Sequence, residues 1–189
     1  MGVSVRILIF AARENLIFTQ MLMKKLVMMA FVAMAMMSCS DDDNENVALT
    51  GTWKLTGFTL DQGVDLNNDG TASSNLITES GCYNNSTVVF GSSNSATFNI
   101  QELDIDYEVV SGTQNSYEYT VDCLGGENET TTYTTSGNNV IVNVGGEEMV
   151  FIQNGNKLTS TFVGGGVPVN DNGDTDFQIL TGTVEFTKQ

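Results

Sequence analysis

Short segments in which apolar and polar residues alternate recur through the chain after residue 50, and they restrict its fold more than any other feature. The clearest example spans 102–109, where four acidic residues alternate with Leu103, Ile105, Tyr107 and Val109. A period of two is the mark of a β-strand with one buried face. No long segment in this part of the sequence has helical periodicity, and only 73–79 could form a turn or two of helix. The pattern therefore predicts an all-β fold.

Turns rich in Gly and Asn separate the expected strands. We expect strands at 51–60, 87–90, 96–101, 102–109, 116–124, 130–135, 140–144, 148–153, 157–163 and 177–187. Because the Gly-Gly pair at 125–126 favours a tight turn, 116–124 is expected to pair with 130–135. Eight to ten short antiparallel strands predict a small up-and-down β-barrel, with a sandwich as the alternative.

The segment before Cys39 has the composition of an export signal. Lys24 and Lys25 precede a 12-residue apolar run, Leu26 to Met37, and the small residue Ser38 follows it. This order predicts a secretory signal peptide. The run is shorter than the roughly 20 residues that a membrane-spanning helix needs. We therefore assign 1–38 to a cleaved signal peptide.

The position of Cys39 resembles the lipidated cysteine of bacterial lipoproteins, although Met36 stands where their signals usually carry Leu. The resemblance implies that Cys39 becomes the first residue and carries acyl chains that anchor the protein to a membrane. The alternative is an ordinary cleaved signal followed by a spare cysteine. Residues 1–22 are either a spurious extension, with Met21 or Met23 as the true start, or a genuine long leader.

An acidic segment follows Cys39, and we assign 39–48 to a tether. Ser40 to Glu45 resembles the acidic tract of Bacteroidota-type lipoproteins, which directs them to the cell surface. The resemblance implies an outer-membrane, lipid-anchored and surface-exposed protein. A solvated tether without a sorting role is the alternative.

The charge balance after Cys39 excludes several classes of function. This part contains Lys54, Lys157 and Lys188 as its only cationic side chains, no Arg and no His, against every acidic residue of the chain except Glu14. Nucleic-acid binding needs clustered Lys and Arg, so no nucleic-acid partner is expected. Catalytic triads and zinc sites built on imidazole are equally excluded. With the alternating acids of 102–108 interpreted as a solvated strand face, we expect no enzyme.

The first expected strand carries a family resemblance. Gly51-Thr52-Trp53 is similar to the Gly-x-Trp of lipocalins, and 49–55, 65–70 and 81–84 resemble lipocalin-like domains of Bacteroidota lipoproteins. The resemblance extends over most of 49–187. It implies one lipocalin-like barrel domain over 49–189, closed around an apolar interior, with Trp53 sealing one end. The Arg that packs on this Trp in lipocalins has no counterpart here.

Two cysteines remain after Cys39. In an oxidising compartment Cys82 and Cys123 are expected to form a disulfide, and the absence of a C-x-x-C arrangement disfavours a redox pair. Cys123 ends the alternating run that contains Tyr117 and Tyr119, which places it on the apolar face of a strand. We therefore expect a buried disulfide.

The segment Asp65 to Thr71 matches the first half of a calcium loop. Asp65, Asn67, Asp69 and Thr71 occupy positions 1, 3, 5 and 7, with Gly at position 6. The bidentate Glu of position 12 is replaced by Leu76. Calcium is thus a candidate cofactor, and a metal-free Asx turn is the alternative.

Aromatic residues are candidates for a ligand cavity. Trp53, Tyr117 and Tyr119 could line it, although in a small barrel such residues more often fill the interior. The first functional hypothesis is a lipid-anchored extracytoplasmic binding module for a small neutral or apolar ligand. The alternative is a structural or interaction lipoprotein whose acidic face meets a surface protein or glycan, with calcium as a mediator.

Overall fold

The computed structural model describes residues 3–7, 47–113, 116–144, 146–171 and 174–189. Its elements are β1 (Val3–Ile7), β2 (Gly51–Val64), β3 (Ser73–Asn75), α1 (Leu76–Ser80), β4 (Thr87–Phe90), β5 (Ser95–Asn99), β6 (Glu102–Val109), β7 (Tyr117–Leu124), β8 (Asn128–Ser136), β9 (Asn139–Val144), β10 (Glu147–Asn154), β11 (Lys157–Asp171) and β12 (Asp174–Lys188). The apolar run of the predicted signal peptide, Cys39 and most of the predicted tether lie outside the described residues.

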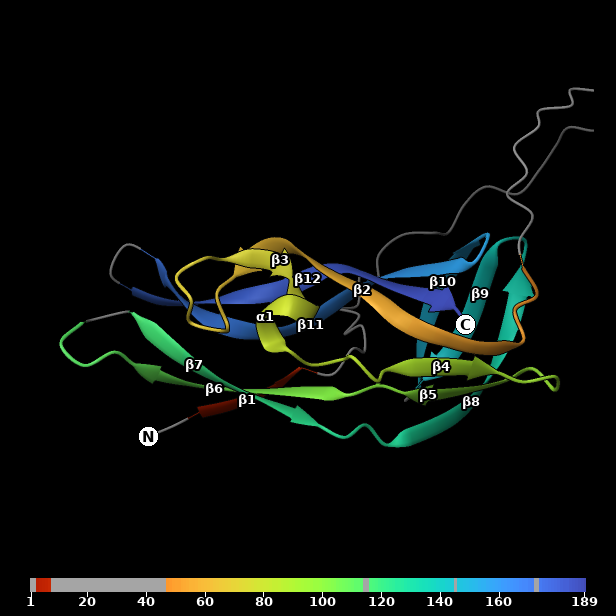
Figure 1. Ribbon diagram of the computed structural model, residues 1–189, viewed down its shortest axis with the longest axis horizontal. Coiled ribbons are helices and arrows are strands. Elements are labelled where there is room, and N and C mark those ends of the chain that lie inside the picture. Colours follow the sequence, from red (N-terminus) through yellow and green to blue (C-terminus); the bar gives the residue numbers. More distant parts are fainter. Residues whose placement is uncertain (1–2, 8–46, 114–115, 145, 172–173) are drawn as a thin grey trace, which may run out of the picture.

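Eight strands form a closed antiparallel barrel (Figure 1). Around the barrel they follow in chain order, β2, β4, β5, β8, β9, β10, β11 and β12, and β12 pairs back with β2. This meander confirms the predicted all-β, up-and-down barrel. Because β12 pairs back with β2, the barrel sheet has no terminal edge strand, which is how small barrels avoid edge-to-edge aggregation.

The predicted pairing of 116–124 with 130–135 is wrong. Strand β7 pairs with β6 along its whole length, and β8 pairs with β5. A Cβ added at Gly126 would lie 1.8 Å from the carbonyl oxygen of Ile100, so the backbone passes very close to the segment that enters β6. Gly126 therefore serves a close crossing of two chain segments, and it does not form the hairpin turn that the sequence suggested.

The β6–β7 hairpin leaves the barrel wall and forms a second layer below the outer part of the β11–β12 hairpin (Figure 1). Strand β11 reaches Asp171, well beyond the predicted end at 163, and pairs with β12 throughout. Helix α1 contacts both β2 and β7. We call β3, α1, β6, β7 and the outer part of β11–β12 the outer lobe.

Aromatic rings from different walls meet inside the barrel. The ring of Phe151 lies 6.3 Å from that of Phe98 and 5.8 Å from that of Phe186, measured between centroids. Phe90 packs edge-on against Tyr133 at 5.1 Å. All five side chains are buried. Burying one such side chain contributes about 1.5–3 kcal/mol, so these contacts are a main source of the barrel's stability.

One end of the barrel is closed by Trp53 and a cation. The Trp53 side chain is fully buried, and its Nε1 donates a 2.7 Å hydrogen bond to the carbonyl of Leu49. Lys188 Nζ lies 5.1 Å from the centre of the Trp53 ring and donates to the carbonyls of Leu49 and Thr50. A cation over the Trp53 ring, expected to be missing because the domain has no Arg, is thus supplied by a lysine of the last strand.

Candidate functional site

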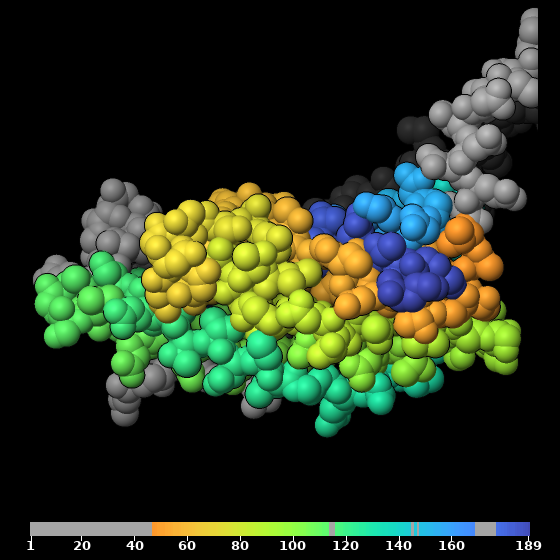
Figure 2. Space-filling model, in the orientation of Figure 1, coloured from red at the N-terminus to blue at the C-terminus, as the bar shows by residue number. Residues whose placement is uncertain are grey.

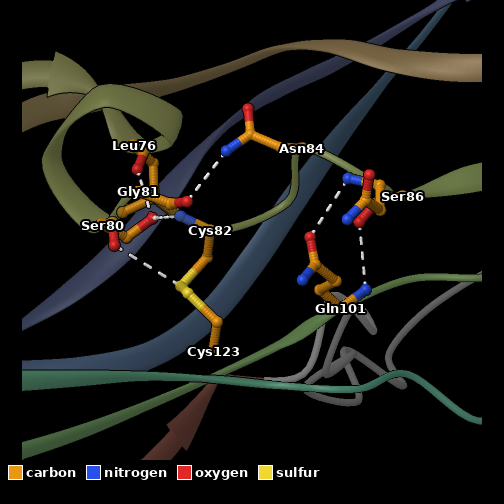
Figure 3. Close-up of a disulfide and its surroundings, with 9 residues drawn as sticks. Leu76, Ser80, Gly81, Cys82, Asn84, Ser86, Gln101 and Cys123 are labelled. Carbon is orange, nitrogen blue, oxygen red and sulfur yellow. Dashed lines mark hydrogen bonds between the residues drawn. A yellow bond between two sulfur atoms is a disulfide. The ribbon is translucent and has the colours of Figure 1, made fainter.

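The Cys82–Cys123 disulfide is present, as predicted, and links the loop after α1 to β7 (Figure 3). Gly81 ends the helix in the left-handed region, with φ of 70°, and its N–H donates to the carbonyl of Ile77. Cys82 is buried but Cys123 is exposed, so the expectation of a fully buried disulfide is only half correct. The link crosses from one layer of the outer lobe to the other.

Tyr83 follows the disulfide and is buried in an uncommon backbone conformation. Its φ is 70°, its side chain has no exposed surface, and its ring lies 5.0 Å from that of Phe58. Among the residues that the structure describes, its hydroxyl is the buried side-chain atom without a hydrogen-bond partner. Desolvation, with a smaller contribution from Glu102, raises the pKa of Tyr83 far above its ordinary value.

The predicted calcium loop is held by hydrogen bonds to its own backbone. The Asp65 carboxylate accepts from the N–H groups of Asp69 and Gly70, at 3.0 and 2.9 Å. Asn67 Oδ1 also accepts from Asp69 N–H, and Asp69 Oδ1 accepts from Thr71 N–H at 2.8 Å. In the described parts of the chain, no three acidic, Cys or His side chains cluster as a metal site. The geometry is that of consecutive Asx turns, and calcium stays a prediction.

The same loop also fastens the outer lobe. Asn68, at φ of 56°, donates from Nδ2 to the carbonyl of Tyr119 at 2.8 Å and accepts from Tyr119 N–H at 2.9 Å. Its side-chain amide therefore pairs with the backbone of β7 as a neighbouring strand would. Sequence reasoning missed this role, because the contact joins residues that are far apart in the chain.

The three predicted ligand residues do not lie together. Trp53 belongs to the barrel sheet and is buried at its closed end, whereas Tyr117 and Tyr119 belong to the separate sheet that contains β6 and β7. The Tyr119 hydroxyl donates a 2.6 Å hydrogen bond to the carbonyl of Pro168 in β11. Burial, with smaller contributions from Tyr117 and Asp65, raises the pKa of Tyr119.

Burial of the inner face of the β6–β7 hairpin decreases toward the hairpin tip. Leu103 and Ile105 are buried, Tyr107 is half-buried, and Val109 is 56% exposed. Register places Tyr117 directly opposite Val109, and the Tyr117 ring lies 5.8 Å from that of Tyr107.

Phe177 of β12 extends this surface. It is half exposed, and its ring lies 6.4 Å from that of Tyr107. We call Tyr107, Val109, Tyr117 and Phe177 the aromatic mouth. In Figure 2 the green hairpin tip that carries part of it projects at one end of the molecule.

The outer face of the same hairpin is acidic. It carries Glu102, Asp104, Asp106, Glu108, Glu118 and Asp122, which we call the acidic ribbon. Register places Asp104 opposite Asp122 and Glu108 opposite Glu118. Like charges directly opposite each other on neighbouring strands are destabilising, so this face favours a cationic neighbour.

A shallow groove of about 360 Å³ lies on the barrel wall where β10 and β11 separate. The two strands pair only from Ile152 and Thr159 to the turn, and beyond that point Ser160 Oγ donates to the carbonyl of Val150. The groove is lined by Asn139, Val150, Ile152, Thr159, Ser160, Thr161 and Thr183. Its exposed Val150 and Ile152 make it a second apolar surface.

Comparison with protein-family models, curated proteins and solved structures finds no match to the chain. Among the described residues, no helix has the length and apolar character needed to cross a membrane. Functional assignment therefore depends on the geometry of the molecule itself.

Proposed function

We propose that this chain is a lipid-anchored extracytoplasmic binding module of the lipocalin-like type, which takes a small neutral or apolar ligand at the aromatic mouth. The observation that carries the proposal is the cluster of half-exposed rings of Tyr107, Tyr117 and Phe177 at the open end of the outer lobe. Aromatic rings offer large, rigid apolar contact surfaces, which is what such a ligand needs.

The mouth is a better site than the barrel interior. Inside the barrel, the ring of Phe151 packs against those of Phe98 and Phe186, and Lys188 lies over the ring of Trp53. These rings contact other side chains of the protein and are not available to a ligand. The acidic ribbon on the same hairpin would repel anionic ligands, which favours neutral ones.

The proposed location is the outer membrane, exposed at the cell surface and held through acyl chains on Cys39. The Cys82–Cys123 disulfide supports a compartment outside the cytoplasm, because such bonds persist in oxidising surroundings. An acyl anchor needs two or more chains, since one chain binds a membrane only marginally. The proposed role requires no catalytic group.

Thermal unfolding with neutral probes tests the proposed site. We expect at least one of a fatty alcohol, a sterol and a flat aromatic hydrocarbon to raise the melting temperature of the wild-type domain. Tyr117→Ala should abolish that shift, whereas Ile152→Ala, which removes an exposed apolar side chain from the barrel-wall groove, should preserve it. A shift lost with Ile152→Ala and kept with Tyr117→Ala would place the site in the groove. No shift with any probe would contradict the proposal.

The acidic ribbon favours a second candidate, an interaction lipoprotein whose partner is a surface protein or glycan. Its opposed carboxylates would be relieved by a cationic partner or by calcium. Titration with calcium and then with a chelator distinguishes a calcium-dependent interaction from one that needs only a cationic partner. A reversible rise in melting temperature that Asp122→Asn removes would support the metal-dependent one.

A further inference from the structure

Strand β1 covers the outer edge of β6. Val3 to Ile7 pairs antiparallel with β6, in a register that runs from Val3 opposite Tyr107 to Ile7 opposite Leu103. The same strand also lies against β11 (Figure 1). Strand β1 therefore contacts both β6 and β11.

Removal of the signal peptide would take this strand away, so the following inference rests on the proposed function. In a chain that begins at Cys39, β6 keeps β7 on one side and loses its partner on the other. A strand edge with unpaired N–H and C=O groups is a template for another strand. Strand β6 contains no Pro or Lys, two of the residues that protect natural edges, and its charged side chains are all acidic, so they disfavour an acidic partner strand but not a basic one.

We propose that the edge of β6 from Leu103 to Tyr107 is a docking site for an extended, basic segment of a partner polypeptide. The segment adds antiparallel to β6 in the place that Val3–Ile7 occupies in the full chain. Main-chain hydrogen bonds supply affinity in this mode of recognition, and side chains at alternate positions supply specificity.

The acidic side chains of β6 favour a basic strand as its partner. The register of β1 places Arg6 opposite Asp104 and Ser4 opposite Asp106. On its other side, Asp104 already faces Asp122. A basic residue opposite Asp104 is therefore favoured, and an acidic one would add a third like charge to the same row.

A second copy of this chain is a poor occupant of the same edge. Two β6 strands paired antiparallel around Ile105 would bring Asp104 of each copy opposite Asp106 of the other. That arrangement multiplies like-charge contacts on a surface that is already acidic. The occupant is therefore a strand from a different, basic polypeptide.

The test uses the chain extracted from membranes and a peptide with the sequence of residues 2–8, Gly-Val-Ser-Val-Arg-Ile-Leu. We expect one peptide to bind per chain and to slow amide hydrogen exchange within 103–107. A matched peptide with Arg6→Glu should bind about two- to thirtyfold more weakly, since it replaces an attractive cross-strand charge pair with a repulsive one and each such pair is worth about 0.2–1 kcal/mol. Asp104→Lys in the protein should reverse the preference between the two peptides.

Three results would overturn the inference. They are no protection within 103–107, equal affinity for both peptides, or protection that arises from dimerisation without peptide. Because the two peptides differ while the protein stays the same, poor folding of Asp104→Lys could not hide the answer. An extracted chain that has lost 1–38 but binds no peptide rejects this inference alone. One that still carries 1–38 rejects the proposed function together with it.

Discussion

At the scale of single residues, Lys188 and Trp53 close the barrel through contacts between its first and last strands. Lys188 directly follows Thr187 as the last residue of β12, and nothing near it in the sequence signals a partner. In the fold, β12 pairs with β2 and brings Lys188 directly opposite Trp53. Partial desolvation also lowers the pKa of Lys188 from its ordinary value.

Replacing Lys188 should weaken the closed end. We expect Lys188→Met to lower the free energy of unfolding by about 1–2 kcal/mol, because it removes a cation–π contact and charged hydrogen bonds to the carbonyls of Leu49 and Thr50. Lys188→Arg should retain most of the stability. Urea unfolding followed by Trp53 fluorescence measures the change. Lys54→Met, on the exposed face of β2, is the control, and an equal loss there would reject this account.

Tyr83 should make stability depend on alkaline pH. Its folded-state pKa is raised above the unfolded value of about 10. Below about pH 10 the tyrosine is neutral in both states and the free energy of unfolding is unaffected, whereas above it only the unfolded state ionises and the free energy of unfolding falls. The loss should approach about 1.4 kcal/mol per pH unit. Tyr83→Phe should remove this slope and cost nothing at neutral pH, because the hydroxyl has no partner. Urea unfolding at several pH values measures both, and parallel pH profiles for the two proteins would contradict the assignment.

At the scale of elements, sequence patterns predicted where the strands lie in the chain better than which strands pair with each other. The alternation in 102–109 predicts the bounds of β6 correctly, and the strand expected at 148–153 lies within β10. Pairing across Gly125-Gly126 failed, because a glycine needed for close backbone approach looks the same in a sequence as one needed for a turn. The outer extension of β11 was missed because Gly164-Gly165-Gly166 resembles a loop, whereas it lies in a strand with a local register shift.

The Asp65–Thr71 loop should stabilise the outer lobe through Asn68. We expect Asn68→Gly to cost about 1–2 kcal/mol, because it removes two hydrogen bonds to the backbone of Tyr119. Glycine keeps the positive φ free of strain, so the loss combines the missing side-chain contacts with the greater freedom of glycine in the unfolded chain. Thermal unfolding measures the change. An unchanged melting temperature would show that the loop does not hold β7.

The disulfide should matter mainly to the outer lobe. Its sequence separation of 41 predicts a loss of about 4 kcal/mol on removal in the chain-entropy model. In the double variant Cys82→Ser, Cys123→Ser we expect faster amide exchange in β6 and β7 than in β9 and β10, which belong to the barrel. Uniform acceleration in all four strands would indicate that barrel and outer lobe unfold as one unit.

At the scale of the whole molecule, the sequence contained the components of the candidate site but not their arrangement. Tyr117 and Trp53 were both recognised as aromatic candidates, yet they lie in different sheets. Phe177 joins Tyr107 only because β12 and the β6–β7 hairpin stack in two layers, and no local pattern encodes that contact. Composition, in contrast, already favoured neutral or cationic partners, since charge does not depend on the fold.

We propose that the closed β-barrel lies outside the cytoplasm and is held there by acyl chains on Cys39. Intact-mass analysis of the protein extracted from bacterial membranes tests that claim most directly. We expect one species that contains residues 39–189 with acyl chains on Cys39. Reduction should release two thiols from it, those of the Cys82–Cys123 disulfide. A chain that retains residues 1–38 and carries an unmodified Cys39 would contradict the account.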